Sequence, residues 1–174
     1  NEGKGWSYEG GTRVCQIARW PGVVSPSTTC RENVQTCDFY PTFLEAAELP
    51  LMPEQHVDGL SMMPLLKGGQ KLNREDIFWH YPNYSNQGAR PACSMVSGNW
   101  KLIENFEDGD LELYNLSDDI SEQQNLTGSD PEHTANMYKR LQAWRQEIEA
   151  KIPEPNPDWV SEMKVPAIPN NAHI

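Results

Sequence analysis

The chain has 174 residues and a formal net charge of −11, with 25 Asp and Glu residues against 14 Lys and Arg. A chain of this length can bury one hydrophobic core and carry a small appendage. The acidic balance disfavours nucleic acid and anionic membranes as partners, and no apolar run reaches the length of a transmembrane span. If such a protein binds an anion, its positive charge must be concentrated locally, at the site.

The N-terminal part contains the segment GKGWSYEGGTR at residues 3–13. Glycines on both sides of Lys4 let the backbone come close to a ligand while the ammonium supplies a compact positive charge, an arrangement that suits a small oxyanion. The alternative is a surface lysine in a flexible end. Glu9 and Arg13 are four residues apart and opposite in charge, which predicts a structural ion pair.

The next sixty residues predict one strand and one helix. Val14–Trp20 is a short apolar-rich run ended by Pro21-Gly22, typical of a buried strand. Asp38 is the predicted N-cap of a helix that runs to about Glu48 and packs one broad apolar face onto a core. That face consists of Phe39, Tyr40, Phe43, Leu44 and Ala47. Residues 60–66 then form a short apolar segment pinned by Pro64 and ended by glycines.

The second half predicts an antiparallel meander covered by a helix. Residues 77–81 are rich in β-forming residues, and residues 92–97 and 100–106 are joined by Gly98-Asn99, a hairpin signal. Asp108-Gly109 marks a second hairpin, into residues 111–115. Asp130-Pro131 starts a helix whose apolar stripe covers the sheet. The stripe consists of Met137, Leu141, Trp144 and Ile148. From Pro153 onward the prolines disfavour regular structure.

The cysteines and acids indicate no metal site. Cys15, Cys30, Cys37 and Cys93 lack the C-x-x-C spacing of a zinc site and are too few for a disulfide framework. Cys30 and Cys37 could pair, or they could be buried free thiols. The acids Asp118, Asp119 and Glu122 lack the spacing of a calcium loop, so we expect solvated loop and helix-cap acids there.

Several stretches of the sequence resemble the formylglycine-dependent sulfatases. Residues 3–13, with Trp20-Pro21-Gly22 at the expected distance, are similar to the lysine-bearing segment of that family. Residues 58–68 match the family pattern D-G-x-S-x-x-P-L-L-x-G, and residues 113–126 match L-Y-x-L-x-x-D-x-x-E-x-x-N-L. The resemblance runs from Gly3 to about residue 158 and implies an α/β fold, the C-terminal portion of an alkaline-phosphatase-like sulfatase fold with a small antiparallel sheet plus helix subdomain.

The resemblance also implies roles for individual residues. Lys4 would contact the sulfate group of a sulfate ester. His80 lies in a stretch, residues 78–88, that is similar to a segment leading toward the substrate cleft, so it could bind substrate or protonate the leaving oxygen; a core histidine is the alternative. Arg90 could bind a second anionic group, or it could be a solvated loop arginine. Two residues depart from the family pattern: Cys15 replaces a proline and Glu48 replaces the glycine that closes the helix.

Parts of the sulfatase machinery are not in this sequence. No cysteine lies in the Cys/Ser-x-Pro-x-Arg motif that yields formylglycine, and the calcium-binding Asp-Asn pair that precedes the lysine in the family is missing. Because Asn1 stands only three residues before Lys4, we expect the chain to be the C-terminal piece of a longer polypeptide whose N-terminal remainder supplies the nucleophile and the calcium ligands.

We expect three parts: residues 1–70 as the end of the catalytic α/β domain, residues 71–152 as the sheet and helix subdomain, and residues 153–174 as a Pro-rich tail. The expected substrate is a sulfated small molecule or polysaccharide, and the family resemblance implies a secreted, periplasmic or lysosomal protein. The alternatives are a non-catalytic binding module derived from a sulfatase, or a related phosphatase or phosphodiesterase.

Overall fold

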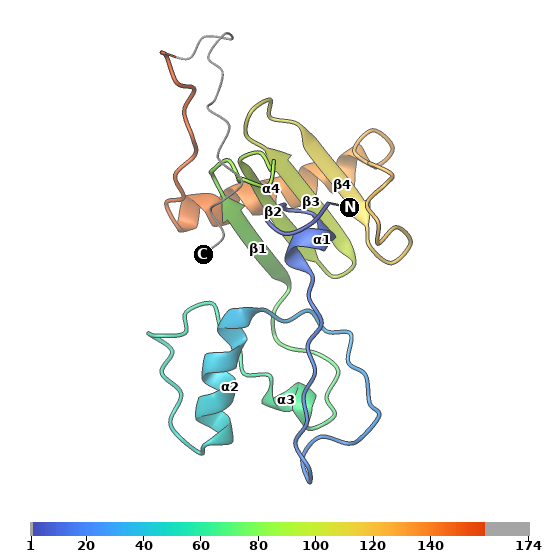
Figure 1. Cartoon of the computed structure of the whole chain (residues 1–174), viewed down its shortest axis with the longest axis vertical. Helices are drawn as coiled ribbons and strands as arrows, with labels where there is room; N and C mark the ends of the chain where they lie inside the picture. Colours follow the sequence, from blue (N-terminus) through green and yellow to red (C-terminus); the bar gives the residue numbers. More distant parts are fainter. Residues whose placement is uncertain (1, 159–174) are drawn as a thin grey trace.

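A four-stranded antiparallel sheet forms the centre of the upper body in the computed structural model, which describes residues 2–158 (Figure 1). The strands follow one another in the order β1-β2-β3-β4, as the predicted meander requires. Their bounds are β1 Asp76–Tyr81, β2 Ala92–Ser97, β3 Trp100–Asn105 and β4 Leu111–Asn115. In this register His80 of β1 lies opposite Cys93 of β2, so both side chains are on one face of the sheet.

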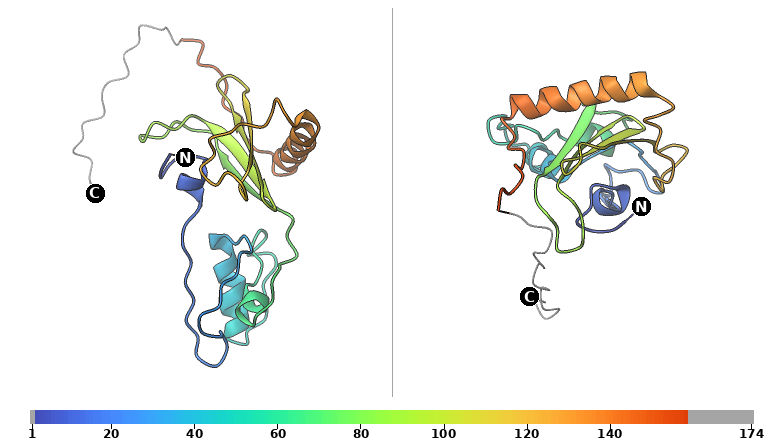
Figure 2. Two further views of the ribbon diagram at one scale, coloured as in Figure 1. Left: turned by 90° about the vertical axis from the view of Figure 1, so that its right-hand side faces the viewer. Right: turned by 90° about the horizontal axis from the view of Figure 1, so that it is seen from above.

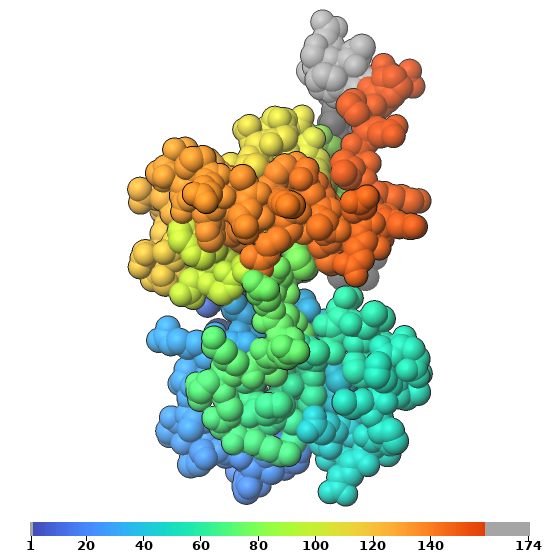
Figure 3. Space-filling view, turned by 180° about the vertical axis from the view of Figure 1, so that it is seen from behind, coloured from blue at the N-terminus to red at the C-terminus, as the bar shows by residue number. Residues whose placement is uncertain are grey.

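Helix α4, Pro131–Glu147, packs against that face (Figure 3). Its start matches the prediction, because the Asp130 side chain accepts a hydrogen bond from the amide of His133 at 3.1 Å. The core between helix and sheet consists of Cys93, Met95, Leu102, Leu113, Met137 and Leu141, all fully buried. Trp144 stacks on Phe78 with ring centroids 4.5 Å apart. Ile148, the last residue of the predicted stripe, is instead 47% exposed, because the helix has ended before it.

The opposite face of the sheet is covered by the N-terminal segment and its short helix α1, Glu9–Thr12. Tyr8 packs there against Ala92, Ile103 and Tyr114. Figure 2 shows the resulting three layers, with the N-terminal segment on one side of the sheet and α4 on the other. Each side chain of the sheet therefore lies either on the face that carries the N-terminal segment or on the face that carries α4, and this division decides which candidate residues can act together.

The lower body contains three short helical elements and long loops (Figure 1). They are the 3-10 helix η1 Thr36–Asp38 and the helices α2 Phe39–Ala46 and α3 Met63–Leu66. Asp38 organises this body: its buried carboxylate accepts hydrogen bonds from the amides of Gln35 and Leu60, at 2.8 and 2.9 Å, and pairs with the guanidinium of Arg74.

Two predictions for the lower body are wrong. Val14–Trp20 is not a strand: it is extended, and Val14 and Ile17 are 84% and 93% exposed, because within residues 2–158 no strand lies beside it to pair with it. The predicted apolar face of α2 does not pack onto a core either, since Phe39 and Phe43 are exposed and the buried residues of the helix are Pro41 and Thr42. The helix begins at Phe39, directly after the predicted N-cap Asp38, and ends about two residues earlier than predicted.

The remaining expectations have mixed outcomes. All four cysteines are free thiols, and Cys30 and Cys37 are exposed rather than buried or paired. Residues 153–158 form neither helix nor strand, as the prolines predict, and the rest of the predicted tail lies outside the described residues. The division of the chain near residue 70 stays a prediction, although residues 8–13 contact the sheet of the second part. The helices of residues 2–158 are too short or too polar to cross a membrane.

Candidate functional site

Lys4 lies exposed on a tight loop at the N-terminal face of the sheet. The loop is closed by a hydrogen bond from the amide of Trp6 to the carbonyl of Gly3, at 3.2 Å. Gly5 has a φ of +92°, a conformation that favours glycine, and a Cβ on Gly11 would lie 2.0 Å from the carbonyl oxygen of Trp6. The two glycines are thus required by the shape of the loop, and no described residue forms an ion pair or hydrogen bond with the Lys4 side chain.

A buried group of charges joins this loop to the sheet. We call it the Lys101 cluster: Lys101 of β3, Glu9 of α1 and Glu122 of the loop that follows β4. The ammonium of Lys101 is fully buried and lies 2.9 Å from Glu9 Oε1 and 3.2 Å from Glu122 Oε1. Glu122 also accepts the backbone amide of Glu9 at 2.8 Å, and Arg13 pairs with Glu9 at 3.2 Å as predicted. The expectation that Glu122 is a solvated acid is wrong, because its side chain is fully buried against Lys101.

Glu112 of β4 forms a second link between the loop and the sheet. Its carboxylate accepts hydrogen bonds from the hydroxyls of Tyr8 and Tyr114, at 2.9 and 2.5 Å, and from the side-chain amide Nδ2 of Asn105 at 2.9 Å. Burial, reinforced by the hydrogen bond to Glu112, raises the pKa of both tyrosines. Both hydroxyls therefore stay protonated and serve as donors, so this negative charge is held by three donors and is not presented to a ligand.

The loop of residues 82–91 lies beside the Lys4 loop. The indole of Trp6 donates to the carbonyl of Gln87 at 3.1 Å, and a Cβ on Gly5 would meet the side chains of Gln87 and Ser85 at 2.6 Å. Arg90, at the end of this loop, is about one-third exposed and pairs with Asp108 at 2.6 Å and with Glu107 at 3.6 Å. The N-terminal face of the sheet thus carries both Lys4 and Arg90, with the guanidinium already bound to two acids.

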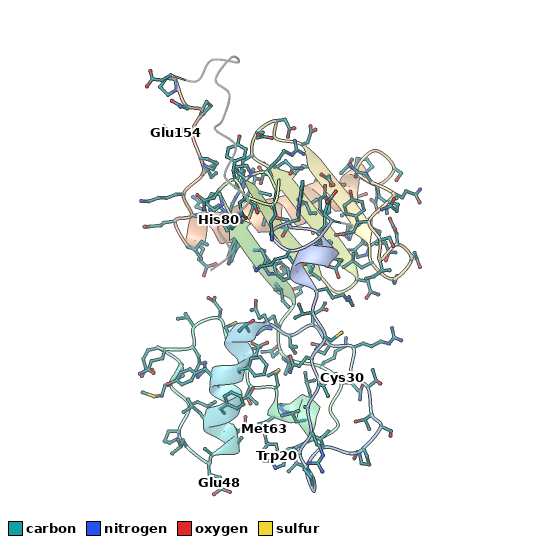
Figure 4. The ribbon with its side chains drawn as sticks, in the orientation of Figure 1. Trp20, Cys30, Glu48, Met63, His80 and Glu154 are labelled. Carbon is teal, nitrogen blue, oxygen red and sulfur yellow. The ribbon has the colours of Figure 1, made fainter. Side chains whose placement is uncertain are left out.

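His80 lies on the other face of the sheet, near the C-terminal end of α4 (Figure 4). Its Nε2 is 2.8 Å from the carbonyl oxygen of Lys151, and its ring packs edge-on against Phe106 with centroids 5.6 Å apart. The structure therefore does not bring His80 and Lys4 together. A substrate-binding role for His80 stays a prediction, while the contacts formed within this chain are those of a packing histidine.

The described residues do not fit the calcium ion that the family resemblance implies. In residues 2–158 no three His, Cys, Asp or Glu side chains are grouped so that they could hold a metal ion. Four acids of the neighbouring elements, Glu9, Glu122, Glu112 and Asp108, are already bound by Lys101, by tyrosine hydroxyls or by Arg90. We therefore derive no chemical step through a metal within this chain.

Sequence reasoning missed the three groups that anchor the site, Lys101, Glu122 and Glu112. One signal was available for Lys101: a charged residue on a hairpin strand, followed by Leu102 and Ile103, is rarely buried without a charged partner. Nothing local to the sequence identified its partners, because Glu9 and Glu122 are 92 and 21 positions away from it.

Comparison with known proteins assigns the class. Residues 3–151 match the family described as N-sulphoglucosamine sulphohydrolase, C-terminal. The chain is 35% identical over 156 residues to a sulfatase of Formosa agariphila, covering 81% of this chain and 28% of that protein. It is 31% identical over 176 residues to human arylsulfatase A, covering 86% of this chain and 34% of that protein.

Solved structures show the same fold. A Bacteroides thetaiotaomicron structure from work on the metabolism of multiple glycosaminoglycans matches with a TM-score of 0.64 at 24% identity, covering 81% of this chain and 31% of that one. A structure in complex with its substrate D-glucosamine-2-N,6-O-disulfate matches with a TM-score of 0.55 at 23% identity, covering 64% of this chain and 24% of that one.

The fold and the lysine-bearing loop define a C-terminal region of the sulfatase class. The chain belongs to the N-sulphoglucosamine sulphohydrolase C-terminal family, and it is homologous to the arylsulfatases and steryl-sulfatases. It spans about a third or less of the length of the curated relatives named above.

Proposed function

We propose that the chain is the C-terminal part of a sulfatase that hydrolyses sulfate esters, and that Lys4 binds the sulfate group. The observation that carries this proposal is the exposed Lys4 side chain, without a carboxylate partner, on a loop that buried charges hold against the sheet. An ammonium in this position neutralises charge on the non-bridging sulfate oxygens and stabilises the charge that passes to the leaving oxygen.

The substrate that we propose is a sulfated carbohydrate. Solved structures with this fold include one in complex with a disulfated glucosamine and one in complex with a neocarrahexaose. Arg90 lies on the same face of the sheet as Lys4, so it could bind a second anionic group of such a sugar if it exchanged Asp108 for the substrate. His80 stays a candidate for substrate binding only if residues outside this chain open a path to the helix-covered face.

The N-terminal remainder of the same polypeptide is the partner that this function requires. We propose that it contributes the formylglycine nucleophile and the calcium ligands, since the described residues hold no grouping that fits a metal ion. By family resemblance we place the whole protein in a secretory, periplasmic or lysosomal compartment, where its sulfated substrates occur.

The test is a Lys4→Ala variant of the longer polypeptide, assayed on an aryl sulfate. Loss of Lys4 should lower turnover roughly a hundredfold or more, as for removal of one oxyanion donor. Lys139→Ala, which removes another exposed lysine from the far side of α4, is the matched control and should keep wild-type turnover. The 174-residue chain alone should hydrolyse nothing, with or without calcium.

Three outcomes would count against the proposal. Wild-type turnover by Lys4→Ala would remove the role of the lysine. Turnover of a phosphate ester in preference to a sulfate ester would indicate the related phosphatases or phosphodiesterases. A longer polypeptide that binds a sulfated sugar but hydrolyses none would indicate a non-catalytic binding module.

A further inference from the structure

We propose that the Lys101 cluster holds Lys4, the sulfate-binding lysine, in position and thereby determines the rate of turnover. This inference rests on the proposed function. Lys101 and Glu122 are positioning residues, since they act through Lys4 and touch no substrate. The cluster joins three segments that are far apart in sequence, namely α1, β3 and the loop after β4.

Glu9 is held at both its backbone and its side chain. Its amide donates to Glu122 Oε2 at 2.8 Å, and its carboxylate contacts Lys101 at 2.9 Å and Arg13 at 3.2 Å. The helix that follows is held as well, because Thr12 Oγ1 lies 3.2 Å from the Lys101 ammonium. These contacts leave α1 little freedom to shift along or away from the sheet.

The four residues between Lys4 and Glu9 transmit this constraint. The amide of Trp6 closes the turn onto Gly3, its indole donates to Gln87, and Tyr8 is bound to Glu112. Trp6 and Tyr8 are thus each held by hydrogen bonds of their own. Gly5 lies close against the side chains of Ser85 and Gln87. A displacement of Glu9 must therefore move Lys4 or break these contacts.

Stability alone does not account for a buried lysine with two buried carboxylates. Removing three charges from water is costly, and replacing a buried ion group by apolar residues of similar volume is often neutral or stabilising. Glu122 also has a φ of +53°, an unfavourable conformation for a residue other than glycine. Strained residues and buried charges persist where the surrounding structure must have one defined geometry, which is what a ligand-binding lysine requires.

The sheet offers a matched comparison on its other face. Glu104, on the same strand as Lys101, forms a buried pair with Arg145 and accepts a hydrogen bond from Tyr138, so it ties α4 to the sheet. Both partners belong to α4, which packs on the face of the sheet opposite the N-terminal segment. Glu104→Gln therefore perturbs a buried charge of the same strand without touching the Lys4 loop.

The experiment is a double-mutant cycle in the longer polypeptide, with kcat on an aryl sulfate as the readout. Glu122→Gln should lower kcat about tenfold, since small misplacements of a catalytic group cost up to a hundredfold. If Glu122 acts through Lys4, the double variant Lys4→Ala/Glu122→Gln should be no slower than Lys4→Ala alone. Glu104→Gln should lower the melting temperature while keeping kcat. Two results would overturn the proposal. One is a double variant whose loss of kcat is the product of the two single losses, and the other is an unchanged kcat in Glu122→Gln.

Two additions keep the result decisive. If Glu122→Gln does not fold, Thr12→Val takes its place, because it removes one contact of Lys101 while keeping every charge. Adding Thr12→Val to Lys4→Ala should then cause no further loss of kcat. Amide hydrogen exchange of residues 3–8 needs no turnover at all: it should rise in Glu122→Gln and stay unchanged in Glu104→Gln. If Lys4→Ala itself keeps turnover, the proposed function fails, and the exchange result alone decides whether the cluster positions the loop.

Discussion

Neutralising Asp38 should destabilise the lower body of the chain more than any substitution in its exposed helix face. The Asp38 carboxylate is fully buried, Arg74 is about nine-tenths buried, and the amides of Gln35 and Leu60 donate to the same carboxylate. Asp38→Asn keeps an acceptor for one amide but leaves the Arg74 charge without its partner. Removing one member of a buried ion pair costs about 3–5 kcal/mol, so we expect a loss near the lower end of that range.

The pH dependence of stability follows from the same contacts. Burial by itself pushes the pKa of Asp38 upward, but hydrogen bonds from Arg74 and from the amides of Leu60 and Gln35 outweigh it and hold the pKa below its ordinary value. The folded state thus favours the carboxylate. Its stabilising contribution is complete above the pKa of the unfolded chain, about 4, and is lost as pH falls through the lower folded value.

Urea denaturation at several pH values measures both effects. The wild-type chain should lose free energy of unfolding between about pH 5 and pH 2, and Asp38→Asn should show a smaller loss over the same interval. Phe43→Ser, on the exposed face of α2, is the control and should change stability little. Equal unfolding midpoints for Asp38→Asn and wild type at pH 7 would refute the reasoning.

Two further substitutions test single contacts. His80→Ala removes the hydrogen bond to Lys151 and the contact with Phe106. It should lower the melting temperature and leave turnover of the longer polypeptide nearly unchanged. A large loss of turnover with an unchanged melting temperature would instead support substrate binding by His80. Glu48→Gly should raise the free energy of unfolding by up to about 1 kcal/mol, because Glu48 closes α2 with a φ of +56° that glycine adopts without strain; a less stable variant in urea would contradict this account.

The upper body was predictable because its signals are local. Gly98-Asn99 and the turn at Asp108-Gly109 set the hairpins, and the β-forming residues of 77–81 identified the first strand of the meander. The cap at Asp130 and the spacing of Met137 and Leu141 identified the helix and its buried face. Each of these features depends on residues a few positions apart, which a sequence displays directly.

The lower body was predicted less well because several of its large apolar residues remain exposed in the described chain. The run Val14–Trp20 has the composition of a buried strand, yet a strand forms only where a second strand accepts its hydrogen bonds. Phe39 and Phe43 likewise have the spacing of a buried face and remain exposed. Both segments are apolar, as the pattern indicated, but the prediction that they are buried is wrong. Burial depends on the residues that lie opposite, which the local sequence does not show.

The location of Lys4 was the most informative feature of the sequence, but its surroundings were not predictable. The glycines around Lys4 indicated an anion site, whereas the sequence alone gave no reason to place His80 behind the sheet. Which face of β1 a residue occupies depends on register, and register is set by pairing with β2 across the loop of residues 82–91. Lys4 and His80 therefore looked like neighbours in function while lying on opposite faces.

The electrostatics of the site resolve the difficulty that the composition raises, namely how a chain with a net charge of −11 could attract a sulfate. Four acids of the neighbouring elements have partners within the chain: Glu9 and Glu122 share Lys101, with Arg13 also on Glu9, Glu112 accepts from two tyrosines, and Asp108 pairs with Arg90. The charges of Lys101, Arg13 and Arg90 reduce the field of the three acids that they pair with, whereas Glu112, held by neutral donors, keeps its full negative charge. If Lys4 binds sulfate as we propose, these ion pairs weaken the opposing negative field at its exposed ammonium, and the buried Lys101 supplies part of that compensation.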